Sequence, residues 1–282
     1  MKRTRRIGFI DYYLDEWHAN NYPAWLRAAT DGEVIVTHAY GQLDSPKGGR
    51  TNAQWCTEMG ITCCATVSEV IAACDGLIVL SPDNCEMHEA LCQEPLRSGK
   101  PVYVDKTFAP DLATARRIFA LADASQTPCY STSALRYAAE YAGLERADIR
   151  AISSVGAGVF EMYVIHQLEP ILMLINAPAK RVMCMRNDGW TGMNIAFADG
   201  RYAMLACFET GAPFALRLCL PNESLALQAE SDFFKAFIAR LAVFFQDGIP
   251  AVSHEETLRI MAVRGAGVRA LETPGAWVDV DE

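Results

Sequence analysis

Apolar and polar positions along the first half of the chain predict strands that alternate with helices. Short apolar runs predict buried strands at residues 6–10, 33–38, 76–80 and 101–104, with one more beginning at Pro128. The stretches between them predict helices at residues 20–29, 68–74, 86–98 and 112–124. Alternation of this kind is typical of βαβ units that build a parallel sheet.

From about Asp148 the pattern changes to extended runs that follow one another directly. Strands are predicted at residues 149–159, 181–186, 193–198, 202–208 and 214–220, with Asp199-Gly200 as a hairpin turn. Helices are predicted at residues 166–175 and 231–246, and another begins at Ser253. We therefore expect an α/β protein in two domains. Residues 1–130 would form a Rossmann-like, doubly wound parallel sheet. Residues 131–282 would form a smaller α+β domain with a mainly antiparallel sheet and the C-terminal helices.

The composition agrees with a globular protein. Of the 282 residues, 51% are hydrophobic and 21% are charged, which favours a packed fold over disorder. The formal net charge of −9 argues against a nucleic-acid-binding surface, which needs a clustered basic face. The N-terminus lacks a secretory apolar region, and no run reaches the roughly 18 apolar residues of a membrane span. We therefore expect a cytoplasmic protein that binds neither nucleic acid nor membrane.

Ten cysteines raise the question of a metal site or a redox function. They form no C-x-x-C pair, and most are scattered among apolar residues. Zinc sites usually pair their ligands at short fixed spacings, so we expect no metal and interpret the cysteines as small hydrophobic residues. A redox or metal protein that uses them is kept as a third hypothesis.

Lys106 is the first candidate for chemistry. The strand at 101–104 delivers Asp105-Lys106-Thr107 at its carboxyl end, and ligands of open α/β sheets bind just beyond such ends. The alternative is a solvated loop lysine beside a loop aspartate. The spacing alone leaves both interpretations open.

Three motifs lie along this region: Ser81-Pro82-Asp83, Ser98-Gly99-Lys100-Pro101-Val102 and Asp105-Lys106-Thr107. Together they resemble the first domain of the Gfo/Idh/MocA family, the glucose–fructose oxidoreductase and inositol dehydrogenase type of NAD(P)-dependent enzyme. The resemblance continues weakly along most of the chain. It implies a domain that binds NAD or NADP, with Lys106 as the catalytic lysine.

The resemblance also implies where a dinucleotide would be contacted. The contacts would come from the segment after the first strand, the second strand, and the loops and helix that follow, namely from Ile10, Asp11, Tyr12, Tyr13, Leu14, His38, Ser81, Pro82, His88 and Asp105.

The phosphate-binding loop departs from the family pattern. Asp11 and Tyr13 stand where the family has glycines, which allow the backbone to approach the pyrophosphate. Asp11, Asp15 and Glu16 would bring negative charge toward a phosphate dianion. The second predicted strand ends at His38 and offers neither the acidic residue of an NAD site nor the basic residue of an NADP site. This loop binds a dinucleotide differently, binds another ligand, or binds nothing.

A second group of candidates lies at the predicted helix of the second domain. His166 matches the family's catalytic histidine, and Glu169 lies three residues further on, where it faces the same side of the helix. Met162 stands where the family has aspartate, and Tyr163 is a substitute proton donor. By resemblance, Lys106 and His166 would act as general acid and base. The alternative for His166 is a structural histidine.

Arg136 and Ser133 follow the last predicted strand of the first domain. Arg136 is suited to clamp a carboxylate, a phosphate or a sugar acid, and Ser133 to bind a hydroxyl group. A helix N-cap is an equally good interpretation of Ser133.

The leading hypothesis is an NAD(P)-dependent oxidoreductase that acts on a sugar, cyclitol or related polyol. Family resemblance implies that it forms a homodimer or higher homo-oligomer through the open face of its second sheet. The alternative is a ligand-binding or regulatory protein that keeps the fold without dinucleotide chemistry. The missing glycines and Met162 favour this alternative.

Overall fold

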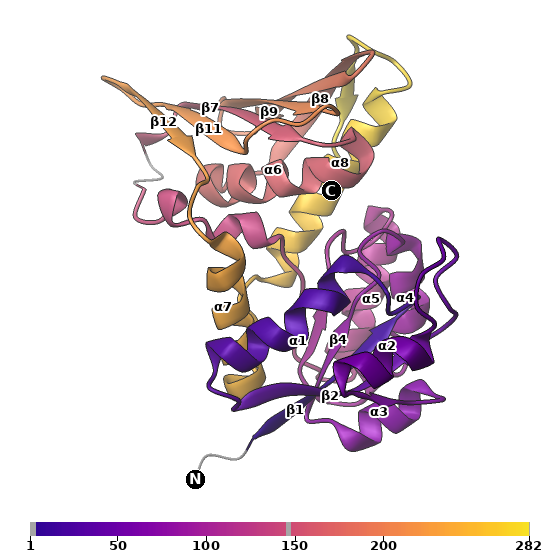
Figure 1. Ribbon diagram of the computed structural model, residues 1–282. Helices are drawn as coiled ribbons and strands as arrows, with labels where there is room; N and C mark the ends of the chain where they lie inside the picture. The colour runs from indigo at the N-terminus through magenta and orange to yellow at the C-terminus, as the bar shows by residue number, and fades with distance from the viewer. Residues whose placement is uncertain (1–3, 145–147, 282) are drawn as a thin grey trace. The chain divides into compact units, whose positions relative to one another are not determined.

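The computed structural model describes residues 4–144 and 148–281. The chain divides into two compact units (Figure 1). The first contains the chain up to Ser131 together with Phe237–His254, and the second contains Thr132–Ala236 and the chain from Glu255 on.

The first unit is built on a six-stranded parallel sheet. Its strands are β1 (Arg5–Asp11), β2 (Val34–Gly41), β3 (Thr62–Cys63), β4 (Gly76–Val79), β5 (Val102–Val104) and β6 (Cys129–Tyr130). They are arranged in the order β3-β2-β1-β4-β5-β6, and every pairing is parallel. This is the doubly wound order, and its switch point lies between β1 and β4. The predicted Rossmann-like sheet is therefore confirmed.

Helices lie on both faces of this sheet. They are α1 (Trp17–Ala29), α2 (Asn52–Met59), α3 (Val67–Ala73), α4 (His88–Leu91), α5 (Leu112–Ala124) and α7 (Phe233–Asp247). A Cβ atom added to Gly8 of β1 would meet the side chain of Val70 in α3. A Cβ atom added to Gly76 of β4 would meet the side chains of Phe245 in α7 and of Ile7 in β1. Because neighbouring residues of a strand point to opposite faces, α3 and α7 cover opposite sides of β1.

The helix predicted at 86–98 is wrong in its length. The structure has three short pieces there: a 3-10 turn at Cys85–Met87, the single α-turn α4, and a second 3-10 turn at Pro95–Arg97. Pro95 lacks the N–H that a continuous helix would use at this point. The sequence analysis also did not identify α2, β3 or the two edge strands of the second sheet.

The second unit is built on a seven-stranded, mostly antiparallel sheet. Its strands are β7 (Ala151–Ala157), β8 (Ala179–Asn187), β9 (Trp190–Phe197), β10 (Tyr202–Phe208), β11 (Ala215–Cys219), β12 (Ser224–Gln228) and β13 (Trp277–Asp279). The order is β12-β11-β7-β10-β9-β8-β13, in which β7 and β10 pair in parallel. The predicted α+β class of this half is confirmed.

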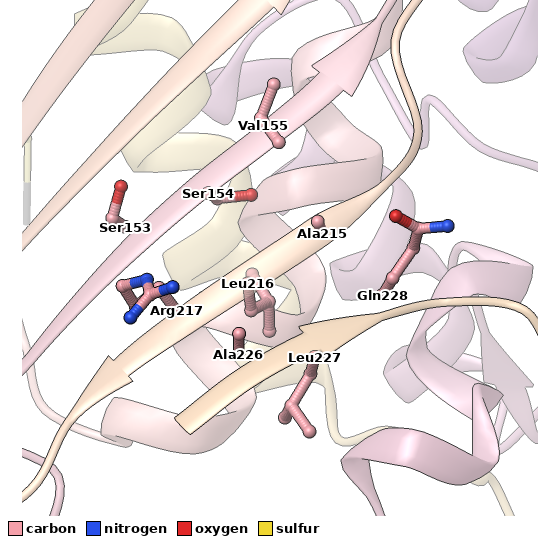
Figure 2. Close-up of a pocket in the computed structure, with 9 residues that line it drawn as sticks. All are labelled: Ser153, Ser154, Val155, Ala215, Leu216, Arg217, Ala226, Leu227 and Gln228. Atoms are coloured by element: carbon pink, nitrogen blue, oxygen red, sulfur yellow. The ribbon is translucent and has the colours of Figure 1, made fainter. Parts of the chain in front are cut away.

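One face of this sheet is covered by α6 (Phe160–Ile175) and α8 (His254–Ala270) (Figure 1). Gln167 of α6 donates to the carbonyl of Ala206, and Cys184 of β8 contacts the carbonyl of Gly267 in α8. No described element of this unit covers the opposite face. A hollow of about 330 Å³ lies over β7, β11 and β12, with Ser153 and Arg217 among its lining residues (Figure 2).

The helix α7 joins the first unit through its aromatic side chains. Phe237 lies 5.5 Å from Tyr103 and 5.9 Å from Tyr22, and Phe244 lies 4.8 Å from Tyr130, measured between ring centres. The sequence analysis placed residues 237–254 in the second domain. The aromatic stripe instead finds its apolar partners on the parallel sheet.

We expect Phe244→Ala to lower the free energy of unfolding by about 3–5 kcal/mol, because it removes a fully buried ring from this contact. The matched control is Val243→Ala, whose side chain is 40% exposed and whose change should be within roughly 1 kcal/mol. Urea unfolding followed by circular dichroism measures both. Equal small effects would contradict the packing of α7 on this sheet.

Candidate functional site

Three carboxylates gather at the carboxyl edge of the parallel sheet. Asp11 is the last residue of β1, Asp105 directly follows β5, and Glu16 precedes α1. Their exposed fractions are only 1%, 1% and 8%. Buried charges are costly unless they are paired, so the contacts of each carboxylate decide what this edge can bind.

Glu16 is the N-cap of α1 and uses both carboxylate oxygens for this purpose. Oε2 accepts from the backbone N–H of His18 at 2.7 Å, and Oε1 accepts from that of Ala19. A helix begins with N–H groups that have no partner within the helix, and in dinucleotide-binding folds such groups hold the pyrophosphate. Burial raises the pKa of Glu16 from 4.5 to about 7, although the charge of His18 and these two hydrogen bonds act in the opposite direction.

Asp11 is only half satisfied. Its Oδ1 accepts from the N–H of Tyr12 at 2.7 Å, whereas Oδ2 has no partner among the described residues. Burial raises the pKa of Asp11 well above its usual range, and the nearby charges of Glu16 and Asp105 raise it further.

Asp105 is paired with His18. The His18 Nδ1 atom contacts Asp105 Oδ2, while Oδ1 accepts from the backbone N–H of Lys106 at 2.8 Å and from the hydroxyl of Tyr103 at 3.4 Å. Burial alone raises the pKa of Asp105, but the charge and hydrogen bond of His18, together with Lys106, outweigh it. The net effect is a lowered pKa.

The loop after β1 is held by the segment that follows β2. The backbone N–H groups of Gln42 and Leu43 donate to the carbonyls of Asp11 and Tyr12, at 3.0 Å each. Asn52 accepts from the N–H of Leu14 at 2.9 Å, and its amide group donates to backbone carbonyls at the end of β2. The sequence analysis missed Asn52. Its only signal was its place directly after Thr51, the N-cap of α2.

A bridge between loops lies over Tyr13. Lys47 Nζ lies 2.7 Å from Asp83 Oδ2 in the loop after β4, and 5.8 Å from the centre of the Tyr13 ring. Tyr13 itself is buried, with 4% exposure. The loops that follow β1, β2 and β4 are thereby joined to one another at the switch point.

This edge does not fit the pyrophosphate of a dinucleotide. The first free N–H groups of α1 already hold a carboxylate, and Tyr13 fills space where the family has glycine. Asp105 keeps a lowered pKa, so its negative charge would repel a phosphate dianion at this edge.

Four other residues predicted to contact the cofactor are buried. Ile10 and Leu14 are fully buried, as is His88, whose two ring nitrogens contact the backbone carbonyls of Phe108 and Leu80 at 3.0 and 2.6 Å. Ser81 is buried and donates to the carbonyl of Asn84.

The expectation that His38 ends the second strand is wrong. The strand β2 continues to Gly41, so that His38 lies inside it and pairs with Thr62 of β3. Its Nδ1 lies 2.9 Å from the Thr37 hydroxyl. Partial burial lowers the pKa of His38, and the charge of Arg6 adds to this effect.

In the second unit, His166 and its neighbours form a second polar group. His166 Nδ1 lies 2.8 Å from the Ser133 hydroxyl, and the ring meets that of Tyr163 edge-on at 5.5 Å. Tyr163 and Met162 are exposed on the first turns of α6. The structure thus joins His166 with Ser133, a substrate residue predicted from sequence.

Arg136 and Glu169 form a buried ion pair. Arg136 Nε donates to Glu169 at 2.7 Å, and the same guanidinium contacts Glu256. Glu169 also accepts from the Thr132 hydroxyl and the Ser133 N–H. Burial raises the pKa of Glu169 against the lowering effect of Arg136. Burial alone would lower the pKa of Arg136, but its two carboxylate partners raise it.

Within residues 4–144 and 148–281, no group of three or more His, Cys, Asp or Glu side chains is arranged to hold a metal ion. The same residues contain no helix that is long and apolar enough to cross a membrane.

Comparison with known proteins places these features in a family context. Residues 42–132 match the model of an oxidoreductase family with an NAD-binding Rossmann fold, named GFO_IDH_MocA. The match begins after β2, so the loop that contains Tyr13 lies outside it. A search of curated protein sequences finds no match.

Solved structures share the fold along nearly the whole chain. The myo-inositol dehydrogenase of Lactobacillus casei, in complex with NAD(H) and myo-inositol, has a TM-score of 0.81 at 13% identity, over 99% of this chain and 97% of that one. The UDP-N-acetylglucosamine 3-dehydrogenase of Acidithiobacillus ferrooxidans has a TM-score of 0.77 at 15% identity, over 96% and 98% of the two chains. The family match over residues 42–132 confirms the predicted resemblance to the Gfo/Idh/MocA family, and these solved structures confirm the fold.

Glu16 should make the stability of the first unit depend on pH. Its pKa is about 7 in the folded protein against an ordinary value of 4.5, so the folded state holds a proton that the unfolded state has released. Stability therefore falls as the pH rises through this window. Asp11 acts in the same direction, whereas the lowered pKa of Asp105 contributes stability that is lost only below its ordinary value of 3.8.

The free energy of unfolding should fall between about pH 5 and about pH 8, and we expect Glu16→Gln to reduce this fall by up to ~3 kcal/mol. Glu86→Gln, at an exposed carboxylate of the same unit, is the matched control and should leave the pH curve unchanged. Urea unfolding across the pH range measures the effect. Parallel curves for wild type and Glu16→Gln would contradict the assignment.

Proposed function

We propose that this chain, a divergent protein of the Gfo/Idh/MocA type, binds a sugar, cyclitol or related polyol without holding a dinucleotide by its pyrophosphate. The observation that carries the proposal is the Glu16 carboxylate on the N–H groups of His18 and Ala19. The Glu16 side chain occupies the N–H groups that would otherwise be open to a ligand anion.

The class of ligand is supported by fold similarity and by the chemistry of the side chains. The similar L. casei dehydrogenase was solved in complex with myo-inositol, a cyclitol. The hydroxyl of Ser133 and the ring of His166 suit the hydroxyl groups of such a ligand. Arg136 is committed to Glu169 and Glu256, so a neutral polyol suits the second unit better than a sugar acid.

We place the ligand-binding and assembly role in the second domain, residues 131–282. The same proposal includes a cytoplasmic location, a small-molecule ligand and no nucleic-acid partner, in line with the net charge of −9. If the protein binds the ligand without transforming it, its role is regulatory.

The second candidate is an NAD- or NADP-dependent oxidoreductase that acts on the same class of substrate. It is favoured by the family match, which includes Lys106. Lys106 and His166 would exchange protons with the substrate, with Tyr163 beside His166 as a further donor. Glu169 would act indirectly, by fixing the backbone of Ser133.

Titration with NADH and NADPH, followed by fluorescence and by thermal shift, separates the two candidates. We expect no saturable binding to the wild type at millimolar concentration. The double variant Tyr13→Gly/Glu16→Ser should gain affinity, because it frees the N–H groups of α1 and removes bulk and charge. Glu86→Ser is the matched control and should behave as the wild type does.

Saturable binding by the wild type would overturn the first candidate in favour of the second. A panel of sugars and polyols would then be tested for turnover with wild type, Lys106→Ala and His166→Ala. Loss of turnover in both variants is expected if these residues carry the proton transfer.

We also propose that the chain forms a homodimer through the open face of its second sheet. This face exposes large apolar side chains, with Met204 55%, Tyr202 50% and Met185 48% exposed. Several large apolar side chains exposed on one face of a sheet are typical of interaction sites.

Met204→Glu should shift the protein from dimer to monomer, because it places a charge in the centre of an apolar interface. Light scattering after size exclusion measures the mass, and Glu86→Lys in the first unit is the control. A monomeric wild type at micromolar concentration would overturn the dimer.

A further inference from the structure

We infer that His18, held by Asp105, is a proton-exchanging group that acts on a hydroxyl of a ligand at the carboxyl edge of the first sheet. The inference rests on the proposed function, because it requires that this edge is free of a pyrophosphate. It assigns to the first unit an acid–base centre of its own.

The contact between His18 and Asp105 fixes the state of the ring. A carboxylate at Nδ1 requires a proton there, which leaves Nε2 of the neutral ring as an acceptor. The two nitrogens lie on opposite edges of the imidazole, so Nε2 points away from Asp105. No described residue is hydrogen-bonded to Nε2, and the His18 side chain is 8% exposed to solvent.

The ring is also fixed in orientation. Tyr22 stacks on one face of His18 at 5.1 Å and 15°, and Trp17 meets it edge-on at 5.2 Å and 68°. Asp105 is itself held by the backbone N–H of Lys106 and by the hydroxyl of Tyr103. A base that is oriented by a second group, which is in turn oriented by others, is the arrangement that general acid–base catalysis uses.

The surrounding charges define which ligand fits. Glu16 and Asp11 face the same cluster as His18 and Asp105, with Lys106 as the nearby positive charge. Acidic groups repel an anionic ligand and accept hydrogen bonds from hydroxyl groups. The Oδ2 atom of Asp11 has no partner among the described residues, on a side chain only 1% exposed, and is open to a hydrogen bond with a ligand hydroxyl.

The proton transfer needs no further reactant. The lone pair of Nε2 takes the proton of a ligand O–H group, whose bond electrons stay on oxygen, and Asp105 stabilises the resulting imidazolium. The reverse step returns the proton. Nothing is oxidised or reduced.

Acylation by diethyl pyrocarbonate tests the inference on the protein without any ligand. An unprotonated, accessible imidazole nitrogen attacks a carbonyl carbon of the reagent, and peptide mass spectrometry resolves the five histidines. We expect His18 to react readily. His88, which is fully buried with both nitrogens on carbonyls, serves as the unreactive internal control.

Asp105→Asn should slow the acylation of His18 by about tenfold or more, because the ring loses the group that fixes its tautomer. Asp105→Glu should restore part of the rate, which a purely structural role would not require. A His18 that reacts no faster than His88, or a rate unchanged in Asp105→Asn, would overturn the inference.

A second measurement covers the case in which Asp105→Asn does not fold. The Nδ1–H proton held by Asp105 should give a low-field proton resonance in the wild type that is absent in His18→Gln. Its absence from the wild type would overturn the dyad. Protection of His18 by NADH in the acylation assay would contradict the proposed function while leaving the reactivity of the dyad intact.

Discussion

The Glu16 carboxylate lies on the two N–H groups that begin α1, and the chemistry of the whole edge depends on this contact. The start of a helix carries partial positive charge and unpaired donors, so it attracts an anion. Here the chain supplies the acceptor, the carboxyl group of Glu16. Because Glu16 is buried beside Asp11 and Asp105, the three groups cannot all be charged without strong repulsion. His18 is hydrogen-bonded to Asp105, whereas burial, with a smaller contribution from the neighbouring carboxylates, raises the pKa values of Glu16 and Asp11.

In the second unit, too, charged side chains are paired with one another inside the protein. Arg136 has the chemistry of an anion clamp, but its guanidinium is already shared by Glu169 and Glu256. Breaking a buried pair of this kind leaves an uncompensated charge, which is strongly destabilising. Arg136 and Glu169 therefore position Thr132 and Ser133, and through Ser133 they bear on His166.

The protein shares its fold with known structures but differs from the family pattern in the loop after β1. Nearly the whole length of the chain shares its fold with solved structures of 12–15% identity, whereas the loop after β1 has no glycine at Asp11 or Tyr13. Fold similarity at this level supports an architecture, and function depends on the groups grafted onto it. The family match begins at residue 42, so the loop after β1 lies outside it.

The sequence by itself determined the two-part architecture and the departure at the loop. Local periodicity identifies apolar runs of strand length and the helical stretches between them. Their alternation predicts βαβ units and therefore a parallel sheet. The absence of glycine at Asp11 and Tyr13 was likewise visible in one line of residues. The break in the helix at Pro95, and the short edge strands, were harder to predict because their pattern is weak.

Only the tertiary structure decided which charged groups are free. Glu16 appeared as one of several acidic residues, and its role as a cap depends on the course of the backbone at residues 16–19. The pairing of His18 with Asp105 joins residues 87 positions apart, and that of Arg136 with Glu256 spans 120. No periodicity encodes such contacts, because they arise from the way distant elements meet. The same holds for α7, whose aromatic stripe was evident in the sequence but whose partners on β5 and β6 were not.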